Sequence, residues 1–392
     1  MNNCKKLPLS ELMTQHTAVE KISDMKNERY ITLSSNGNGA HERVIKDGKY
    51  PVPFSGYRVS EGQFIYSRID ARNGAYDIIP SELDGFVVSK DFPVFDVDTS
   101  KVLPRFLLRS VLSNGFIEQV KHSSFGATNR MRIKEDVFGS YLIRIPPLDI
   151  QNNIVECLDK AQSIIKYRRD EIIRLDELVK AQFVELFGDM SDPMCKWDKC
   201  KLVDVCSDPN DIKCGPFGTQ LGKDEYTNSG VEVWEIPQIN SEFRVMPTHF
   251  VSKEKAQDLE QYSIKSGDIA MSRKGNVGRC AVFPETFEEG IIHSDVLRIR
   301  VDNSRVAPVF MMRQLHYSGD VQHQIELVSS GAIMAGINVT KLKEILVYIP
   351  PKGLQDEFVS FVKQVDKSKV VIQKALDATQ LLFSSLMQLY FG

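Results

Sequence analysis

Apolar residues recur at alternating steps of four and three along two tracts of the chain, residues 154–179 and 358–390. In the first tract, which Arg168 interrupts, the apolar positions are Ile154, Leu158, Ala161, Ile165, Ile172, Leu175 and Val179. In the second, which Lys369 and Thr379 interrupt, they are Phe358, Val362, Val365, Ile372, Leu376, Phe383, Leu386 and Tyr390. An apolar period of 3.5 residues kept over about five heptads is typical of a coiled coil. We therefore predict two long helices that pair with each other, with two ordinary core helices as the alternative.

The residues that flank these tracts support one long helix in each. Pro147 and Pro351 stand just before the tracts, and neither tract contains an internal proline. Gly188 and Pro193 follow the first tract and predict a linker there. A helix of about 38 residues would be about 57 Å long at 1.5 Å per residue, which is long for globular packing.

The chain also resembles itself at a spacing of about half its length. Residues 57–68 align with residues 262–273 at an offset of 205, with Tyr, Gly, Ser and Arg at the same places. Further on, Ile145, its two following prolines and Gln151 match Ile349, two prolines and Gln355 at an offset of 204. One residue of drift is what a single loop deletion would leave, so we infer an internal duplication.

The segments between the two helical tracts are predicted to be mixed helix and strand. Short β-rich runs at residues 85–89, 92–97 and 296–301 alternate with turn residues, and helices are expected at 104–114 and 308–317. The fold class is therefore α/β (α+β), with two similar globular domains and two long helices forming an antiparallel, pseudo-twofold coiled coil. The expected boundaries are 1–147 for the first domain, 148–188 for its helix, 189–196 for the linker, 197–351 for the second domain and 352–392 for its helix.

Composition limits the classes of function. The 392 residues include 42% hydrophobic residues, enough for a core in each domain, and no apolar run approaches the length of a membrane span. The N-terminus is not followed by an apolar signal core, and seven thinly spread cysteines suit a reducing cytoplasm, so we expect a cytoplasmic protein. A net charge of −3 means that any DNA binding would depend on local basic clusters or on partner proteins.

This order of domains and helices resembles the specificity subunit of type I restriction–modification systems. The resemblance covers nearly the whole chain and is strong only when its segments are taken together, in order. In the first half they are residues 62–68, 84–85, 88–92, 145–151 and 175–189; in the second half they are 215–221 and 267–278.

The resemblance implies a protein without a catalytic centre that reads double-stranded DNA with two target-recognition domains. It implies a split target, with each domain reading one half-site and the coiled coil fixing the unread spacer. It also implies two modification (methyltransferase) subunits, which bind S-adenosylmethionine and methylate adenine, and restriction subunits that translocate and cleave DNA. No cofactor is expected on this chain. Because the first domain lacks a counterpart of residues 215–221, the two half-sites should differ.

Candidate DNA-binding residues cluster in the repeated segments and in nearby polar loops. Arginine can bind guanine bidentately, asparagine or glutamine can bind adenine, and lysine or backbone amides can hold phosphates. For the first domain the candidates are Ser67, Arg68, Arg72, Asn73, Asn129, Arg130 and Arg132. For the second they are Thr219, Gln220, Ser272, Arg273, Lys274, Asn276 and Arg279, with Gln238 and Asn240 as weaker ones. The alternative for each cluster is a solvated loop or a tight turn.

Other apparent motifs are weak. Cys195, Cys200, Cys206 and Cys214 crowd one region without any CxxC pair, so a zinc site is not predicted. Residues 218–224 imitate a phosphate-binding loop but lack the hydroxyl residue that would bind magnesium. Two rival classes remain: a duplicated coiled-coil scaffold that does not read DNA sequence, and an enzyme with its own nuclease or methyltransferase centre. No motif for adenine methylation or nuclease chemistry supports the second.

Overall fold

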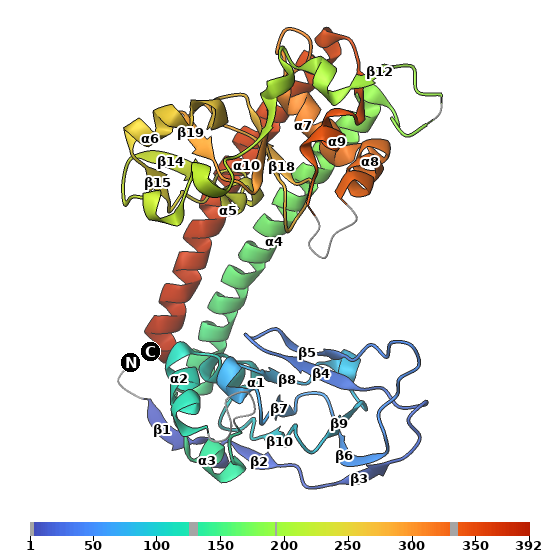
Figure 1. Ribbon diagram of the computed structural model, residues 1–392. Coiled ribbons are helices and arrows are strands. Elements are labelled where there is room, and N and C mark those ends of the chain that lie inside the picture. The colour runs from blue at the N-terminus through green and yellow to red at the C-terminus, as the bar shows by residue number, and fades with distance from the viewer. Residues whose placement is uncertain (1–3, 125–131, 193, 330–335) are drawn as a thin grey trace. The chain divides into compact units, whose positions relative to one another are not determined.

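The computed structural model describes residues 4–124, 132–192, 194–329 and 336–392 (Figure 1). The chain divides into two compact units. The first unit contains residues 1–170 and 373–392, and the second contains residues 171–372. Each unit therefore combines one mixed helix–strand region with part of both long helices.

The first unit is built on a four-stranded antiparallel sheet of order β2-β10-β7-β8. Its strands are β2 (Met13–Gln15), β10 (Val94–Val97), β7 (Phe64–Tyr66) and β8 (Tyr76–Ile78). A second sheet joins β3 (Glu20–Ile22), β6 (Phe54–Arg58) and β9 (Val87–Ser89), and a hairpin joins β4 (Ile31–Ser34) to β5 (Gly39–Glu42). The pair β1 (Lys5–Pro8) and β11 (Leu142–Ile145) leads into the long helix α4 (Leu148–Phe187).

Aromatic packing holds the helices of the first unit on its main sheet. Phe138 lies 4.3 Å from Tyr66 between ring centroids and is fully buried with it. The helices are α1 (Pro104–Val111), α2 (Asn114–Ser123) and α3 (Glu135–Ser140). The helix expected at 104–114 ends at Val111, because Ser113 instead caps α2 by accepting a hydrogen bond from the Phe116 amide.

The second unit repeats this plan. A four-stranded antiparallel sheet of order β13-β20-β17-β18 contains β13 (Ile212–Cys214), β20 (Val296–Ile299), β17 (Ile269–Ser272) and β18 (Cys280–Val282). A second sheet contains β15 (Phe250–Val251), β14 (Val231–Trp234), β19 (Gly290–Ile292) and β16 (Ser263–Ile264), of which β14 and β19 are parallel. The pair β12 (Asp198–Lys201) and β21 (Leu346–Ile349) leads into α10 (Lys352–Phe391). The other helices are α5 (Ile236–Asn240), α6 (Lys253–Asp258), α7 (Pro308–Tyr317), α8 (Gly319–Ser329) and α9 (Val339–Lys343).

The predicted antiparallel pairing of the two long helices is confirmed within each unit (Figure 1). In the first unit, the start of α4 packs in one core with the end of α10, through residues such as Leu158 and Phe383. In the second, the end of α4 packs with the start of α10, through Phe183 and Phe358, whose rings lie 5.5 Å apart. Lys369 interrupts the apolar seam because its ammonium binds Asp176 of α4 at 2.7 Å.

Candidate DNA interface

In the first unit, the repeated segment ends in the β7–β8 hairpin, whose loop folds tightly on itself. The Ser67 hydroxyl accepts a hydrogen bond from the Asp70 amide at 3.3 Å, and Ser67 is only 5% exposed. Asn73 is exposed on the short turn of residues 71–73, and its amide group donates to Asp70 at 3.4 Å. Arg72, on the same turn, is half-buried. Asn73 and Arg72 therefore face the surface more than Ser67 does.

The structure brings the second polar cluster of this domain against the same hairpin. Glu135 at the start of α3 forms an ion pair with Arg68, and the Ile133 amide donates to the Arg68 carbonyl at 3.3 Å. Arg132 is exposed and pairs with Asp91 at 3.3 Å. The Arg68 guanidinium is thus paired inside the domain, whereas the ion pair of Arg132 with Asp91 lies at the surface. Asn129 and Arg130 lie outside the described residues.

A neighbour that sequence analysis missed is the turn between β4 and β5. The Asn36 amide donates to the Asn73 carbonyl at 2.7 Å, and the Gly37 amide donates to the Gly74 carbonyl at 3.2 Å. Asn36 adopts a φ of 60°, in the left-handed region, and Asn36 and Asn38 are both exposed. Asn36 thus adjoins the candidate Asn73 although the two lie 37 positions apart in the chain, and the sequence contains no signal for that contact.

In the second unit, backbone hydrogen bonding and glycines shape the matching hairpin turn between β17 and β18. The Ser272 amide donates to the Arg279 carbonyl at 2.7 Å, and Gly275 and Gly278 have φ values of 69° and 82°. Ser272 is fully buried and its hydroxyl lies 3.3 Å from the Asn240 side-chain oxygen. Asn276 and Arg279 are exposed on the same turn. Of the candidates on this turn, Asn276 and Arg279 are the ones presented to solvent.

Arg273 and Lys274 connect this turn to other segments of the second unit. The Arg273 guanidinium donates to the Ile337 carbonyl at 3.1 Å and lies 4.8 Å above the Phe217 ring, next to Thr219 and Gln220. Lys274 pairs with Asp295 at 2.7 Å. The predicted segment around Thr219 and Gln220 therefore lies beside the β17–β18 turn, and Asn240 lies beside Ser272 of the same hairpin, although the sequence placed none of these next to another.

Thr219 and Gln220 are both exposed, on the short turn Gly218–Gln220. The Gln220 side-chain oxygen already accepts hydrogen bonds from the Phe217 amide and the Tyr262 hydroxyl, both at 3.0 Å. The Thr219 side chain has no such internal bond among the described residues. Thr219 is therefore better placed than Gln220 to contact a ligand.

A polar cluster near this surface was also missed. The His249 ring nitrogen lies 2.8 Å from a Glu235 carboxylate oxygen, while His293 lies 3.9 Å from the other oxygen. His293 also accepts from the Asp295 amide at 3.2 Å, which links the cluster to Lys274. Its members come from three separate segments, so the scattered histidines gave no spacing pattern to follow.

One buried cysteine–histidine pair does not have the properties of a nucleophilic centre. Cys280 lies 3.3 Å from the His316 ring, but burial raises the pKa of the thiol to about 12 and lowers that of His316 to about 4. Nucleophilic cysteines have lowered pKa values and partial exposure, opposite to what is found here. In the described part of the chain, His, Cys, Asp and Glu form no group able to hold a metal ion, and no helix has the length and apolarity for a membrane span.

The family sequence model for the type I restriction modification DNA specificity domain matches residues 6–175 and 194–379, once in each repeat. The HindI specificity subunit of Haemophilus influenzae is 28% identical over 137 residues, which are 35% of this chain and 30% of that protein. The match thus spans less than a third of that relative's length.

Two solved structures share the fold over the whole chain. The type I restriction-modification system S subunit from M. genitalium is 14% identical, with a TM-score of 0.59 over 100% of this chain and 96% of that one. A chain from a structure on complex assembly and conformational transition of the type I R-M system is 16% identical, with a TM-score of 0.58 over 100% and 98%. With both repeats matched by one family model, this chain belongs to the type I restriction–modification DNA specificity family.

Proposed function

We propose that this chain selects the DNA sequence for a type I restriction–modification complex and has no catalytic role itself. The observation that carries the proposal is the duplicated hairpin: the same β-hairpin recurs in both units with different exposed residues at its turn. Two related domains with different exposed residues suit a split target with two unlike half-sites. The family match to each repeat supports the same reading.

Each domain contacts DNA through the few candidate side chains that are exposed at its surface. In the second unit, Arg279 is suited to guanine or to phosphate, Asn276 to adenine, and Thr219 to either. In the first unit, Asn73 and Arg132 are the exposed candidates, and the turn at Asn36 lies beside Asn73. The hydroxyls and guanidinium of Ser67, Ser272 and Arg68 support these loops and do not read bases.

The helix pair sets the distance between the two half-sites. Each of the two helices is 40 residues long, and the pairing is continuous with the core of each unit. Half-sites about one turn of DNA apart would present both heads to one side of the duplex. We extend the proposal to partners: two modification subunits that carry S-adenosylmethionine, restriction subunits, and DNA, which these partners also clamp.

The test is methylation mapping of genomic DNA in cells that express this chain with its modification subunits. We expect methylated adenines within one split, asymmetric sequence. Exchanging residues 197–351 for those of another family member should replace one half-site and keep the other. The competing scaffold hypothesis expects no sequence preference, so methylation that ignored the exchange would refute our proposal.

A further inference from the structure

In both units, the residues that follow one particular strand lie against the candidate hairpin, which is β7–β8 in the first unit and β17–β18 in the second. The strand segments correspond, because Tyr30 bridges Val87 of β9 in parallel, as β14 pairs with β19 in parallel. In the second unit the following residues form α5, and the Asn240 side-chain oxygen lies 3.3 Å from the Ser272 hydroxyl of the hairpin. That asparagine side chain therefore makes a contact inside its own domain.

In the first unit, the backbone makes the equivalent contact. In the turn between β4 and β5, the Asn36 amide donates to the Asn73 carbonyl at 2.7 Å, and the Gly37 amide donates to the Gly74 carbonyl at 3.2 Å. Gly37 and Gly74 have φ values of 70° and 72°, which glycine adopts without strain. Asn36 is exposed, and its side chain has no hydrogen-bond partner among the residues that the structure describes. The contact with the hairpin thus leaves this side chain available to a ligand.

Asp77 of β8 holds the β4–β5 hairpin in this position. One oxygen of its carboxylate accepts a hydrogen bond from the Ala40 amide of β5 at 2.6 Å, and the other accepts from the Ile78 amide at 2.8 Å. Gly39 allows this approach, since a Cβ atom there would collide with the Asp77 carboxylate. Hydrogen bonds to a charged acceptor are stronger than those between neutral groups. A carboxylate of the β7–β8 hairpin therefore determines where the neighbouring turn lies.

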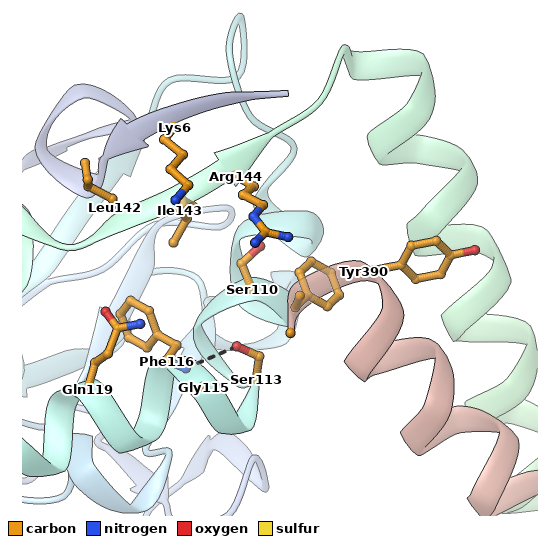
Figure 2. A pocket seen from close by; sticks show the side chains of 12 residues that line it. Lys6, Ser110, Ser113, Gly115, Phe116, Gln119, Leu142, Ile143, Arg144 and Tyr390 are labelled. Carbon is orange, nitrogen blue, oxygen red and sulfur yellow. Dashed lines mark hydrogen bonds between the residues drawn. The ribbon is translucent and has the colours of Figure 1, made fainter. Parts of the chain in front are cut away.

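The corner between α1 and α2 packs against the same turn. A Cβ atom on Gly37 would lie 3.5 Å from the Leu112 side chain, which is ordinary van der Waals contact. The next residue, Ser113, caps α2 by accepting a hydrogen bond from the Phe116 amide, which Figure 2 shows as a dashed line. These contacts fix the turn before any ligand binds, as a site that selects its ligand requires.

We propose that the β4–β5 turn is a second base-reading element of the first domain, in which the Asn36 side chain binds an adenine in the major groove and Asp77 is the positioning residue. This role presupposes the DNA reading proposed for the chain. A side-chain amide presents a donor and an acceptor side by side, which match N6 and N7 of adenine. Residues 35–38 include no charged residue, so the turn contacts DNA by hydrogen bonding and not by attraction to phosphates. Because Asn240 makes an internal contact, the second domain should have no equivalent of this reading element.

The test is equilibrium binding of the chain, assembled with its modification subunits, to its own target and to single-base variants of that target. Asn36→Gly removes the side chain and keeps the left-handed backbone. We expect affinity to fall about tenfold and preference to be lost at one A·T pair, in the half-site that is kept when residues 197–351 are exchanged. Replacing that adenine with 7-deazaadenine, which lacks the N7 acceptor, should weaken binding of the normal protein without weakening Asn36→Gly further. Asn27, an exposed asparagine near the other end of β4, is the control in Asn27→Gly.

Asp77→Ser tests the positioning role, because the serine hydroxyl is too short to replace the bond to the Ala40 amide. We expect it to relax preference at the same A·T pair, with no further loss when it is combined with Asn36→Gly. Asp77→Asn retains an acceptor oxygen and should restore most of the preference. A merely structural role would instead lower Tm and weaken binding to all sequences alike, and that result would remove Asp77 from the proposal.

Two results with Asn36→Gly would overturn the adenine contact. Unchanged affinity and preference would mean that the turn does not touch DNA, and an equal loss for all sequences would make it a phosphate contact. Either result would leave the proposed function standing, provided that the normal protein still preferred its split target. A normal protein without any sequence preference would refute the proposed function as well.

Discussion

Gln151 and Gln355 make the same three hydrogen bonds at the same place in the two repeats. The Gln151 side chain accepts from the Leu103 amide at 2.8 Å and donates to the Lys101 and Pro146 carbonyls at 3.0 and 2.9 Å. The Gln355 side chain accepts from the Ala307 amide and donates to the Arg305 and Pro350 carbonyls, at 2.9, 3.3 and 2.8 Å. Both glutamines are fully buried. Each one ties the start of a long helix to the loop before α1 or α7.

Replacing either glutamine with leucine should destabilise its unit. Gln151→Leu and Gln355→Leu each leave one amide and two carbonyls without their partner in a buried position, so we expect a loss of about 3 kcal/mol in the free energy of unfolding. Urea denaturation followed by circular dichroism measures it. Gln364→Leu, at an exposed position of α10, is the control and should change stability by less than about 0.5 kcal/mol. Equal effects at all three positions would contradict the role given to the buried pair.

Arg279 and Arg273 should respond differently to substitution by alanine. Arg279 is exposed and has no side-chain partner among the described residues, so Arg279→Ala should weaken DNA binding by about 1–3 kcal/mol and leave folding unchanged. Arg273→Ala should also cost about 1 kcal/mol of stability, because its bond to the Ile337 carbonyl and its contact with Phe217 are lost.

Binding-site selection with the assembled complex distinguishes the two kinds of contact for Arg279. Relaxed preference at one base position would mean base reading, whereas a uniform loss with a smaller salt dependence would mean phosphate contact. Arg279→Lys retains the charge and should preserve only a phosphate contact. If Arg279→Ala left affinity and preference intact, the β17–β18 turn would not be part of the DNA interface.

His316 should make the second unit less stable in acid. Burial and the nearby Arg313 and Arg279 lower its pKa from 6.5 to about 4, so the unfolded chain binds a proton at a higher pH than the folded protein does. Stability from this group is complete above about pH 6.5 and falls as the pH drops toward 4, by about 2–3 kcal/mol in all.

The measurement is the free energy of unfolding between pH 4 and pH 7, in the normal protein and in His316→Gln. The glutamine variant should lose much of the slope in this range while retaining a neutral side chain beside Cys280. His41, which is exposed, serves as the control in His41→Gln. An unchanged slope in His316→Gln would mean that other groups cause the acid sensitivity.

Lengthening the helix pair should lengthen the spacer of the DNA target. Seven residues inserted into both α4 and α10, in register with the apolar seam, add about 10 Å at 1.5 Å per residue. At about 3.4 Å per base pair, we expect the preferred spacer to grow by about three base pairs while both half-sites stay the same. Methylation mapping reads this out. A spacer that stayed at its original length would refute the ruler mechanism.

The duplication, the two long helices and the family could be predicted from the sequence because each depends on local or periodic information. The 3.5-residue period identifies α4 and α10, and the aligned Gln151 and Gln355 fix the repeat, whatever the rest of the chain does. Even the interruption at Lys369 was visible in the pattern. The candidate site is different. The residue types of the site could be recognised in the sequence, but whether each side chain is exposed could not.

Only the tertiary structure decided which candidates remain free to bind. Arg68 is engaged by Glu135, 67 residues away, and Arg273 by Ile337, 64 residues away, whereas Arg279 and Asn276 stay at the surface. A polar side chain takes whichever partner the fold brings within about 3 Å, and such partners carry no period or spacing in the sequence. For the same reason, the turn at Asn36 beside Asn73 became visible only once distant segments were packed together.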